Sequence, residues 1–127
     1  MISATPASRT VTRLLAWLLL AAIVALTLVP PGWRPVTGVP HKLEHFATFV
    51  VAGGAFALAY PGHAWLLGLM AVLFTAALEL MQLLSPGRHA RWSDFLVDAA
   101  GACIAIAVVA TFARVRRQSD ARPSLFR

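Results

Sequence analysis

The side chains best suited to chemistry lie between residues 79 and 98, where one long apolar segment ends and the next begins. In chain order they are Glu79, Gln82, Arg88, Arg91, Asp94 and Asp98. A smaller group, at the start of another apolar segment, consists of His41, Lys42 and His45. Charged groups inside or beside membrane-length apolar segments are costly and are usually kept for a specific role. Three kinds of role are compatible with these residues.

The first role is recognition of a lipid headgroup or glycolipid. Arginine holds phosphate through two parallel hydrogen bonds, and lysine holds it as a point charge. We therefore expect Lys42 and Arg88 to meet phosphate, whereas Arg91 is interpreted as lying among the phosphates of the surrounding lipid. The other expected headgroup-binding residues are His45, Glu79, Gln82, Asp94 and Asp98.

The second role is acid–base catalysis. A histidine beside a carboxylate can exchange a proton near neutral pH, so the catalytic candidates are His45, Glu79 and Asp98. No serine or cysteine stands next to a base in the manner of an activated nucleophile; Ser85 and Ser93 are interpreted as turn and helix-capping residues. No spacing matches a hydrolase or phosphatase motif, so the reaction, if there is one, stays undefined.

Metal binding and a purely structural role are the remaining interpretations. His45, Glu79, Asp94 and Asp98 have donor atoms that suit a divalent metal, but no ligand spacing supports one, and neither a metal nor a cofactor is predicted. The single cysteine, Cys103, is interpreted as a small core residue. In the structural interpretation the acids, Arg88 and His45 neutralise one another and fix the helices, because buried ion pairs often set specificity rather than stability.

The composition predicts a membrane protein. Of 127 residues, 59% are hydrophobic and only 13% are charged. A soluble domain of this size could not bury that much apolar surface, so lipid is the simplest solvent for it. The net charge of +6 does not indicate nucleic-acid binding, because the basic residues lie at the ends of apolar segments rather than along one soluble face.

Four apolar segments must position the polar residues. They cover residues 14–29, 41–60, 64–84 and 93–113, and each is close to the roughly 20 residues that cross a bilayer. Prolines and glycines between residues 30 and 40, at 61–62 and at 85–87 separate them. The first segment has the leucine-rich character of a signal peptide, but no small-residue cleavage site follows it.

These segments predict an all-α integral membrane protein, a bundle of four transmembrane helices with both termini cytoplasmic. Residues 1–13 would form a cytoplasmic N-terminal arm, 14–113 the membrane domain and 114–127 a basic cytoplasmic tail. The orientation follows from the arginines of the arm and the tail, since cytoplasmic flanks carry the excess of basic residues. The opposite end keeps four basic residues, which we interpret as held there for a local purpose: Arg34, Lys42, Arg88 and Arg91.

The depth of the polar groups predicts a pocket. At about 1.5 Å per residue, His45, Glu79 and Asp98 fall in one layer just below the outer surface. Helical periodicity places Glu79 on a stripe of small and polar residues and Phe74 on the opposite, lipid-facing stripe. Asp98 shares its stripe with Asp94, Gly101, Ala102 and Ala105. We expect a polar pocket near the outer leaflet.

Four motifs carry a resemblance to a known family. They are His-Lys-x-x-His-Phe at 41–46, Glu-x-x-Gln at 79–82, Pro-Gly-Arg at 86–88 and Ser-Asp-x-x-x-Asp-x-x-Gly at 93–101. In their order, spacing and placement at span ends they resemble the VanZ-like family of small bacterial membrane proteins. The sequence departs from the family pattern at His41, where an acid is common, at Asp98, where asparagine is common, and at Ala105, the place of a second glycine.

The resemblance implies a cell-envelope role in a bacterial cytoplasmic membrane, because the family is named for a protein associated with teicoplanin resistance. The expected partner is a membrane lipid or a lipid-linked cell-wall precursor. The alternative is a small intramembrane hydrolase or transferase acting on such a lipid.

Overall fold

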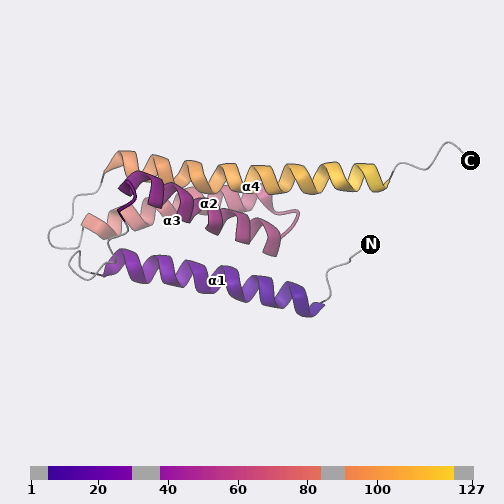
Figure 1. Ribbon diagram of the computed structural model, residues 1–127, viewed down its shortest axis with the longest axis horizontal. Helices are drawn as coiled ribbons and strands as arrows, with labels where there is room; N and C mark the ends of the chain where they lie inside the picture. The colour runs from indigo at the N-terminus through magenta and orange to yellow at the C-terminus, as the bar shows by residue number, and fades with distance from the viewer. Residues whose placement is uncertain (1–5, 30–37, 84–90, 122–127) are drawn as a thin grey trace, which may run out of the picture.

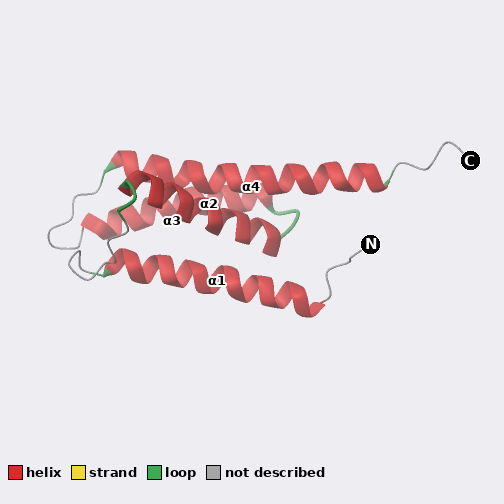
Figure 2. Ribbon diagram, in the orientation of Figure 1, coloured by secondary structure: helices red, strands yellow, loops and turns green. Residues whose placement is uncertain are grey.

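The chain folds into four helices in the computed structural model, which describes residues 6–29, 38–83 and 91–121. They are α1 (Pro6–Leu28), α2 (His41–Ala59), α3 (Ala64–Leu83) and α4 (Trp92–Asp120). All regular secondary structure in these described ranges is helical (Figure 2). The all-α prediction and the number of helices are confirmed.

Two helix boundaries differ from those expected. Helix α1 begins at Pro6, within the predicted N-terminal arm, because proline suits the first helical turn and no helix breaker follows it. Helix α4 continues seven residues beyond Ala113 into the basic tail and ends at Asp120. Arginine favours helix and nothing between Arg114 and Asp120 interrupts it. The predicted turn after α2 is confirmed, with Gly62 at a positive φ of 93°.

Neighbouring helices run antiparallel, so α2 and α4 run in the same direction. Helix α1 lies along one side of the molecule and α4 along the other, with α2 and α3 between them (Figure 1). The Arg13 side chain near the start of α1 donates a hydrogen bond to the Ala59 carbonyl at the end of α2 (3.4 Å). In α3 and α4, Cys103 Sγ lies 4.0 Å from the carbonyl oxygen of Gly68.

The closest helix pair is α2 with α4. A Cβ atom placed on Gly53 of α2 would lie 2.5 Å from the carbonyl oxygen of Ala102, and one on Gly101 of α4 would lie 2.8 Å from that of Phe46. Such distances leave no room for a side chain, so both glycines are required for the two backbones to meet. Small residues are the usual means of close helix approach in membranes.

One apolar core joins all four helices. Its buried members are Ile23, Phe49, Ala52, Leu78 and Ala102. Phe74, which the periodicity placed on the lipid side, packs against this core instead. The expected lipid-facing position is therefore wrong for Phe74, because a large side chain at the edge of a helix face can still pack on the core.

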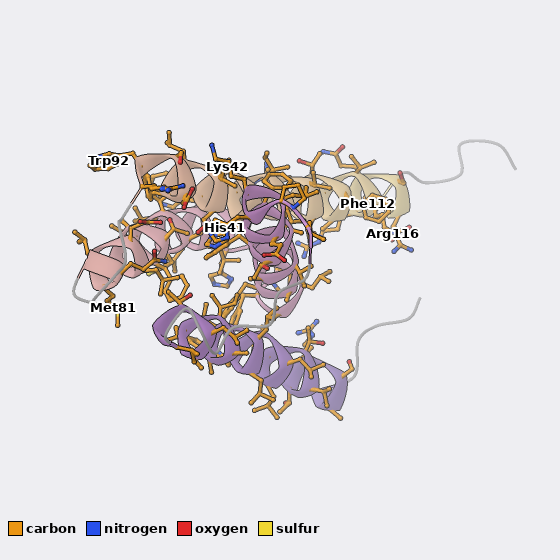
Figure 3. The ribbon with its side chains drawn as sticks, turned by 60° about the vertical axis from the view of Figure 1, so that its left-hand side comes forward. His41, Lys42, Met81, Trp92, Phe112 and Arg116 are labelled. Carbon is orange, nitrogen blue, oxygen red and sulfur yellow. The ribbon has the colours of Figure 1, made fainter. Side chains whose placement is uncertain are left out.

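The outer surface is apolar. Large hydrophobic side chains are more than half exposed on every helix, for example Leu18, Leu58, Leu80 and Phe112. Three helical segments are long and apolar enough to cross a membrane: Ala7–Thr27, Ala64–Gln82 and Trp92–Asp120. Figure 3 shows Trp92 and Met81 near one end of the molecule and Phe112 and Arg116 near the other. Lipid is the solvent that this surface requires.

Candidate functional site at the polar end of α2 and α4

A histidine and an aspartate join α2 to α4 near the start of both helices. The His45 Nδ1 atom lies 3.1 Å from each carboxylate oxygen of Asp98. The Asp98 side chain is only 6% exposed and that of His45 is 20% exposed. A carboxylate bound to one ring nitrogen fixes the orientation and the tautomer of an imidazole.

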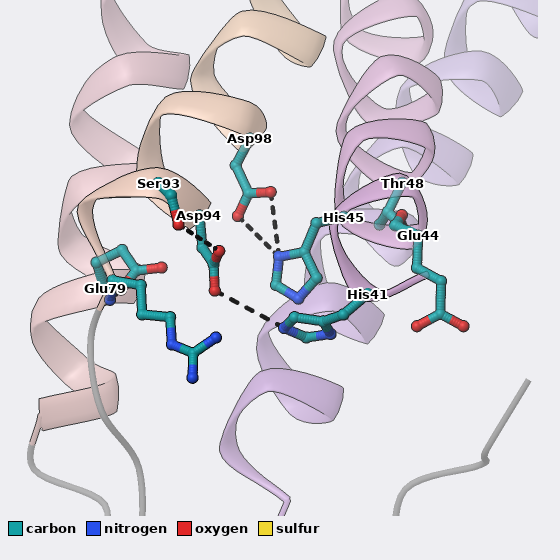
Figure 4. A network of polar contacts seen from close by, with 9 residues as sticks. His41, Glu44, His45, Thr48, Glu79, Ser93, Asp94 and Asp98 are labelled. Atoms are coloured by element: carbon teal, nitrogen blue, oxygen red, sulfur yellow. Dashed lines mark hydrogen bonds and ion pairs between the residues drawn. The ribbon is translucent and has the colours of Figure 1, made fainter. Parts of the chain in front are cut away.

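A second histidine–aspartate pair lies one turn nearer to the helix ends. The His41 Nε2 atom is 3.8 Å from Asp94 Oδ2, and the His41 and His45 rings meet edge to face with centroids 4.2 Å apart. Because both helices place residues four apart on one face, two histidines of α2 face two aspartates of α4 (Figure 4). Ser93 Oγ also donates a hydrogen bond to Asp94 Oδ1 at 3.1 Å.

Glu79 brings α3 to the same end of the bundle. Its Oε2 atom accepts a hydrogen bond of 3.2 Å from the backbone N–H of Arg91, the residue that precedes α4. Its other oxygen, Oε1, is buried and has no hydrogen-bond partner among the described residues, and the residue as a whole is 8% exposed. A buried carboxylate oxygen is stabilised by a hydrogen-bond donor, so Oε1 is an acceptor that the described residues leave open.

A cavity opens on the other side of His45, between α1 and α2. Its volume is about 650 Å³, within the range of ligand pockets. Its polar wall is formed by His45, Glu44 and Thr48, and its apolar wall includes Leu43 and Phe49. Glu44 and Thr48 lie on the side of α2 turned away from Asp98 (Figure 4). His45 therefore contacts the buried aspartate and also belongs to the lining of the cavity.

The predicted site residues separate into those that the structure brings together, those that it places apart, and those outside the described ranges. The structure brings His45, Asp94 and Asp98 together, with Glu79 beside them. Lys42 is exposed and does not belong to the described cavity lining, and Gln82 is half-buried with no side-chain hydrogen bond to the described residues.

Arg88 lies outside the described residues, as does the Pro-Gly turn before it. Arg91, expected to act only through its side chain, contributes its backbone N–H to Glu79. The capping prediction for Ser93 is wrong. The N-cap is Arg91, and the Ser93 hydroxyl bonds to Asp94 instead.

Sequence reasoning did not assign a role to two residues of this region. His41 was named beside His45 but not among the expected site residues, and Glu44 was left without a function, yet the first faces Asp94 and the second lines the cavity. The signal was present in the helical spacing of His41, Glu44, His45 and Thr48, which cover adjoining faces of one helix. Within the described ranges, no group of three or more histidine, cysteine or acidic residues is arranged to hold a metal ion.

The fold and the site together define a multi-pass membrane protein with a polar cluster at one end of its helices. The chain belongs to the VanZ/LLP1 family, whose sequence pattern matches residues 5–113. This confirms the resemblance carried by the four motifs. Neither a curated protein nor a solved structure matches the chain significantly.

Proposed function

We propose that this VanZ-like protein recognises the headgroup of a cell-envelope lipid or lipid-linked cell-wall precursor at the polar end of the bundle. The observation that carries the proposal is the cavity of about 650 Å³ beside His45, a residue whose orientation a buried aspartate sets. Oriented polar groups in a largely apolar pocket are typical of small-molecule sites. Lys42 and the Arg91 side chain, both exposed at this end, are available to phosphate at the rim.

Two buried carboxylate oxygens support recognition of a headgroup. Among the described residues, Glu44 Oε1 and Glu79 Oε1 are both buried without a hydrogen-bond partner. Buried polar atoms are usually hydrogen-bonded. A bound headgroup with hydrogen-bond donors would satisfy such atoms.

The proposal places α2 in the membrane as a fourth span. At about 1.5 Å per residue its 19 residues cover about 28 Å, close to the thickness of the hydrocarbon core. Its polar first turn, with His41, Lys42 and Glu44, lowers its mean hydropathy, while its second half packs on α4 through Gly53. Lipid-exposed backbone inside a bilayer must be helical, which favours a full span over a loop.

In the proposed orientation both termini are cytoplasmic and the polar cluster faces the outer leaflet of a bacterial inner membrane. The start of α1 carries Arg9 and Arg13, and the end of α4, at the same end of the bundle, carries Arg114, Arg116 and Arg117 (Figure 1). Basic residues in excess mark the cytoplasmic side. A reporter that is active only in the cytoplasm should give signal when fused after Arg127 and none when fused after Pro35. Equal signals from both would contradict this topology.

A second function, acid–base catalysis on the same lipid, is favoured by one specific observation. The His45 Nδ1 contact with Asp98 is the arrangement in which a carboxylate orients a catalytic imidazole. No nucleophile lies beside the pair among the described residues, so a hydrolase would have to activate water. Release of headgroup from a labelled lipid by the purified protein, lost in His45→Gln, would support this function over binding alone.

The decisive experiment for recognition is lipid retention. The protein is purified in native-lipid discs, and co-isolating lipids are quantified by mass spectrometry for the parent protein and for His45→Ala. We expect a lipid class that is enriched with the parent protein and depleted at least several-fold with the variant. A matched control is His63→Ala, which changes an exposed histidine in the α2–α3 turn at the other end of the bundle. Identical lipid profiles for all three proteins would overturn the proposed function.

A further inference from the structure

The chemistry of the cavity wall indicates which headgroup it suits. Glu44 lines the cavity, and its Oε1 atom is buried with no hydrogen-bond partner in the part of the chain that the structure describes. The Thr48 hydroxyl, also in the wall, donates its hydrogen bond to the backbone carbonyl of Glu44 at 2.7 Å and so leaves the carboxylate unpaired. A carboxylate oxygen can only accept a hydrogen bond when ionised, so its complement is a donor.

The charge of the described cavity lining also favours a hydrogen-bond donor. It contains one carboxylate, one imidazole and two threonine hydroxyls, and no lysine or arginine among the described lining residues. A phosphate placed against this carboxylate would be repelled, whereas an ammonium would form a charge-assisted hydrogen bond. Lys42 lies outside this lining, so phosphate is better placed at the rim than beside Glu44.

A second, apolar groove adjoins the cavity at Phe49. It has a volume of about 350 Å³ and shares Phe49 with the cavity. Its floor consists of the small residues Ala52, Gly53 and Ala102, where α2 and α4 approach most closely. Trp17 and Phe56, which meet edge to face with centroids 5.3 Å apart, line its far end. The groove is almost wholly apolar, whereas the cavity has polar groups on one wall, so together they suit a lipid with a polar headgroup and an apolar chain.

We propose that the cavity and the groove hold one lipid whose headgroup ends in an ammonium with N–H donors. The ammonium lies against Glu44 and one hydrocarbon chain lies along the groove between α1 and α3. This inference rests on the proposed function and adds to it the chemical class of the headgroup and the position of the chain.

The headgroup test compares lipids that differ only in their N–H donors. The protein is reconstituted in discs of equal parts phosphatidylethanolamine, phosphatidylcholine and phosphatidylglycerol with identical chains, and retained lipid is read by native mass spectrometry. We expect phosphatidylethanolamine to be retained on the order of tenfold over phosphatidylcholine, the effect of one charge-assisted hydrogen bond. Glu44→Gln should remove most of this preference. Asp120→Asn, which changes an exposed acid at the opposite end, should keep it.

The chain test fills the groove. Ala71 lines the groove and Ala77, on the same helix, is exposed and lies outside it. Ala71→Leu should lower retention of phosphatidylethanolamine several-fold, and Ala77→Leu should leave it unchanged. Thermal unfolding of both variants in detergent is the control that tests whether each variant is folded.

The outcomes separate this inference from the proposed function. Equal retention of phosphatidylethanolamine and phosphatidylcholine, or a preference that Glu44→Gln leaves intact, would overturn the ammonium at Glu44. If lipid retention still fell in His45→Ala, headgroup recognition would stand without the ammonium contact at Glu44. Equal retention by Ala71→Leu and Ala77→Leu would overturn the chain position.

Discussion

The α2–α4 interface has two regions that are built in opposite ways. In the middle, the backbones meet at Gly53 and Gly101 with no space for a side chain. At the end, His41 and His45 face Asp94 and Asp98, so the helices contact each other through long polar side chains. The comparison teaches that close backbone packing brings the two helices together, and that the polar end is carried by this packed scaffold. Polar groups placed on a rigid scaffold can be oriented for a ligand.

The middle region gives the largest expected loss of stability. Gly53→Ala would force the new Cβ into the Ala102 carbonyl, so the helices must separate, and we expect a loss of about 1–3 kcal/mol in the free energy of unfolding. Gly54→Ala is the matched control, because a Cβ there meets nothing within 4 Å. Thermal or denaturant unfolding in detergent measures both. Equal stability of the two variants would mean that the close contact is not what joins α2 to α4.

The inner histidine–aspartate pair gives the next largest effect. Asp98→Ala removes the hydrogen-bond partner of His45 Nδ1, and because the His45 side chain is 20% exposed to solvent the loss should be about 1–2 kcal/mol. Asp98→Asn keeps an acceptor oxygen and should cost less. Lipid retention then tests the polar end. It should fall in Asp98→Ala but persist in Gly54→Ala, because Gly54 lies outside the described lining of both the cavity and the groove. The reverse result would place the binding site away from the polar end.

The outer pair should matter less than the inner one. The His41 side chain is 53% exposed and its Nε2 lies 3.8 Å from Asp94, so solvent weakens the attraction. We expect His41→Ala to change the free energy of unfolding by at most about 1 kcal/mol. Double-mutant cycles on His41 with Asp94 and on His45 with Asp98 measure the two couplings directly. A stronger coupling for the outer pair would contradict the expectation that the more buried pair is coupled more strongly.

The smallest effect is expected at Lys42. Its side chain is exposed and outside the described cavity lining, so Lys42→Ala should change stability by no more than about 0.5 kcal/mol. Its effect on lipid retention should be smaller than that of Asp98→Ala. A loss of retention equal to that of Asp98→Ala would move phosphate recognition from the rim to the centre of the site.

Much of the site could be predicted because helical periodicity links sequence to faces. Asp94, Asp98, Gly101, Ala102 and Ala105 share one stripe, and all five are buried in α4. The contact of His45 with Asp98 followed in outline from their equal depth. Helical spacing gives the face of α2 on which Glu44 lies, but the cavity that it lines could not be predicted, because that cavity exists only where α1 packs against α2.

By itself, the sequence determined the number of helices, their apolar outer surface and the end of the bundle at which the polar groups gather. These depend on hydropathy and on a fixed rise per residue, which are local properties. Only the tertiary structure decided which partner each polar group meets. The backbone N–H of Arg91 bonds to Glu79, Phe74 turns into the core, and Lys42 stays outside the cavity. Such contacts join residues that are distant in the chain, and they depend on how closely two helices approach, which here is set by two glycines.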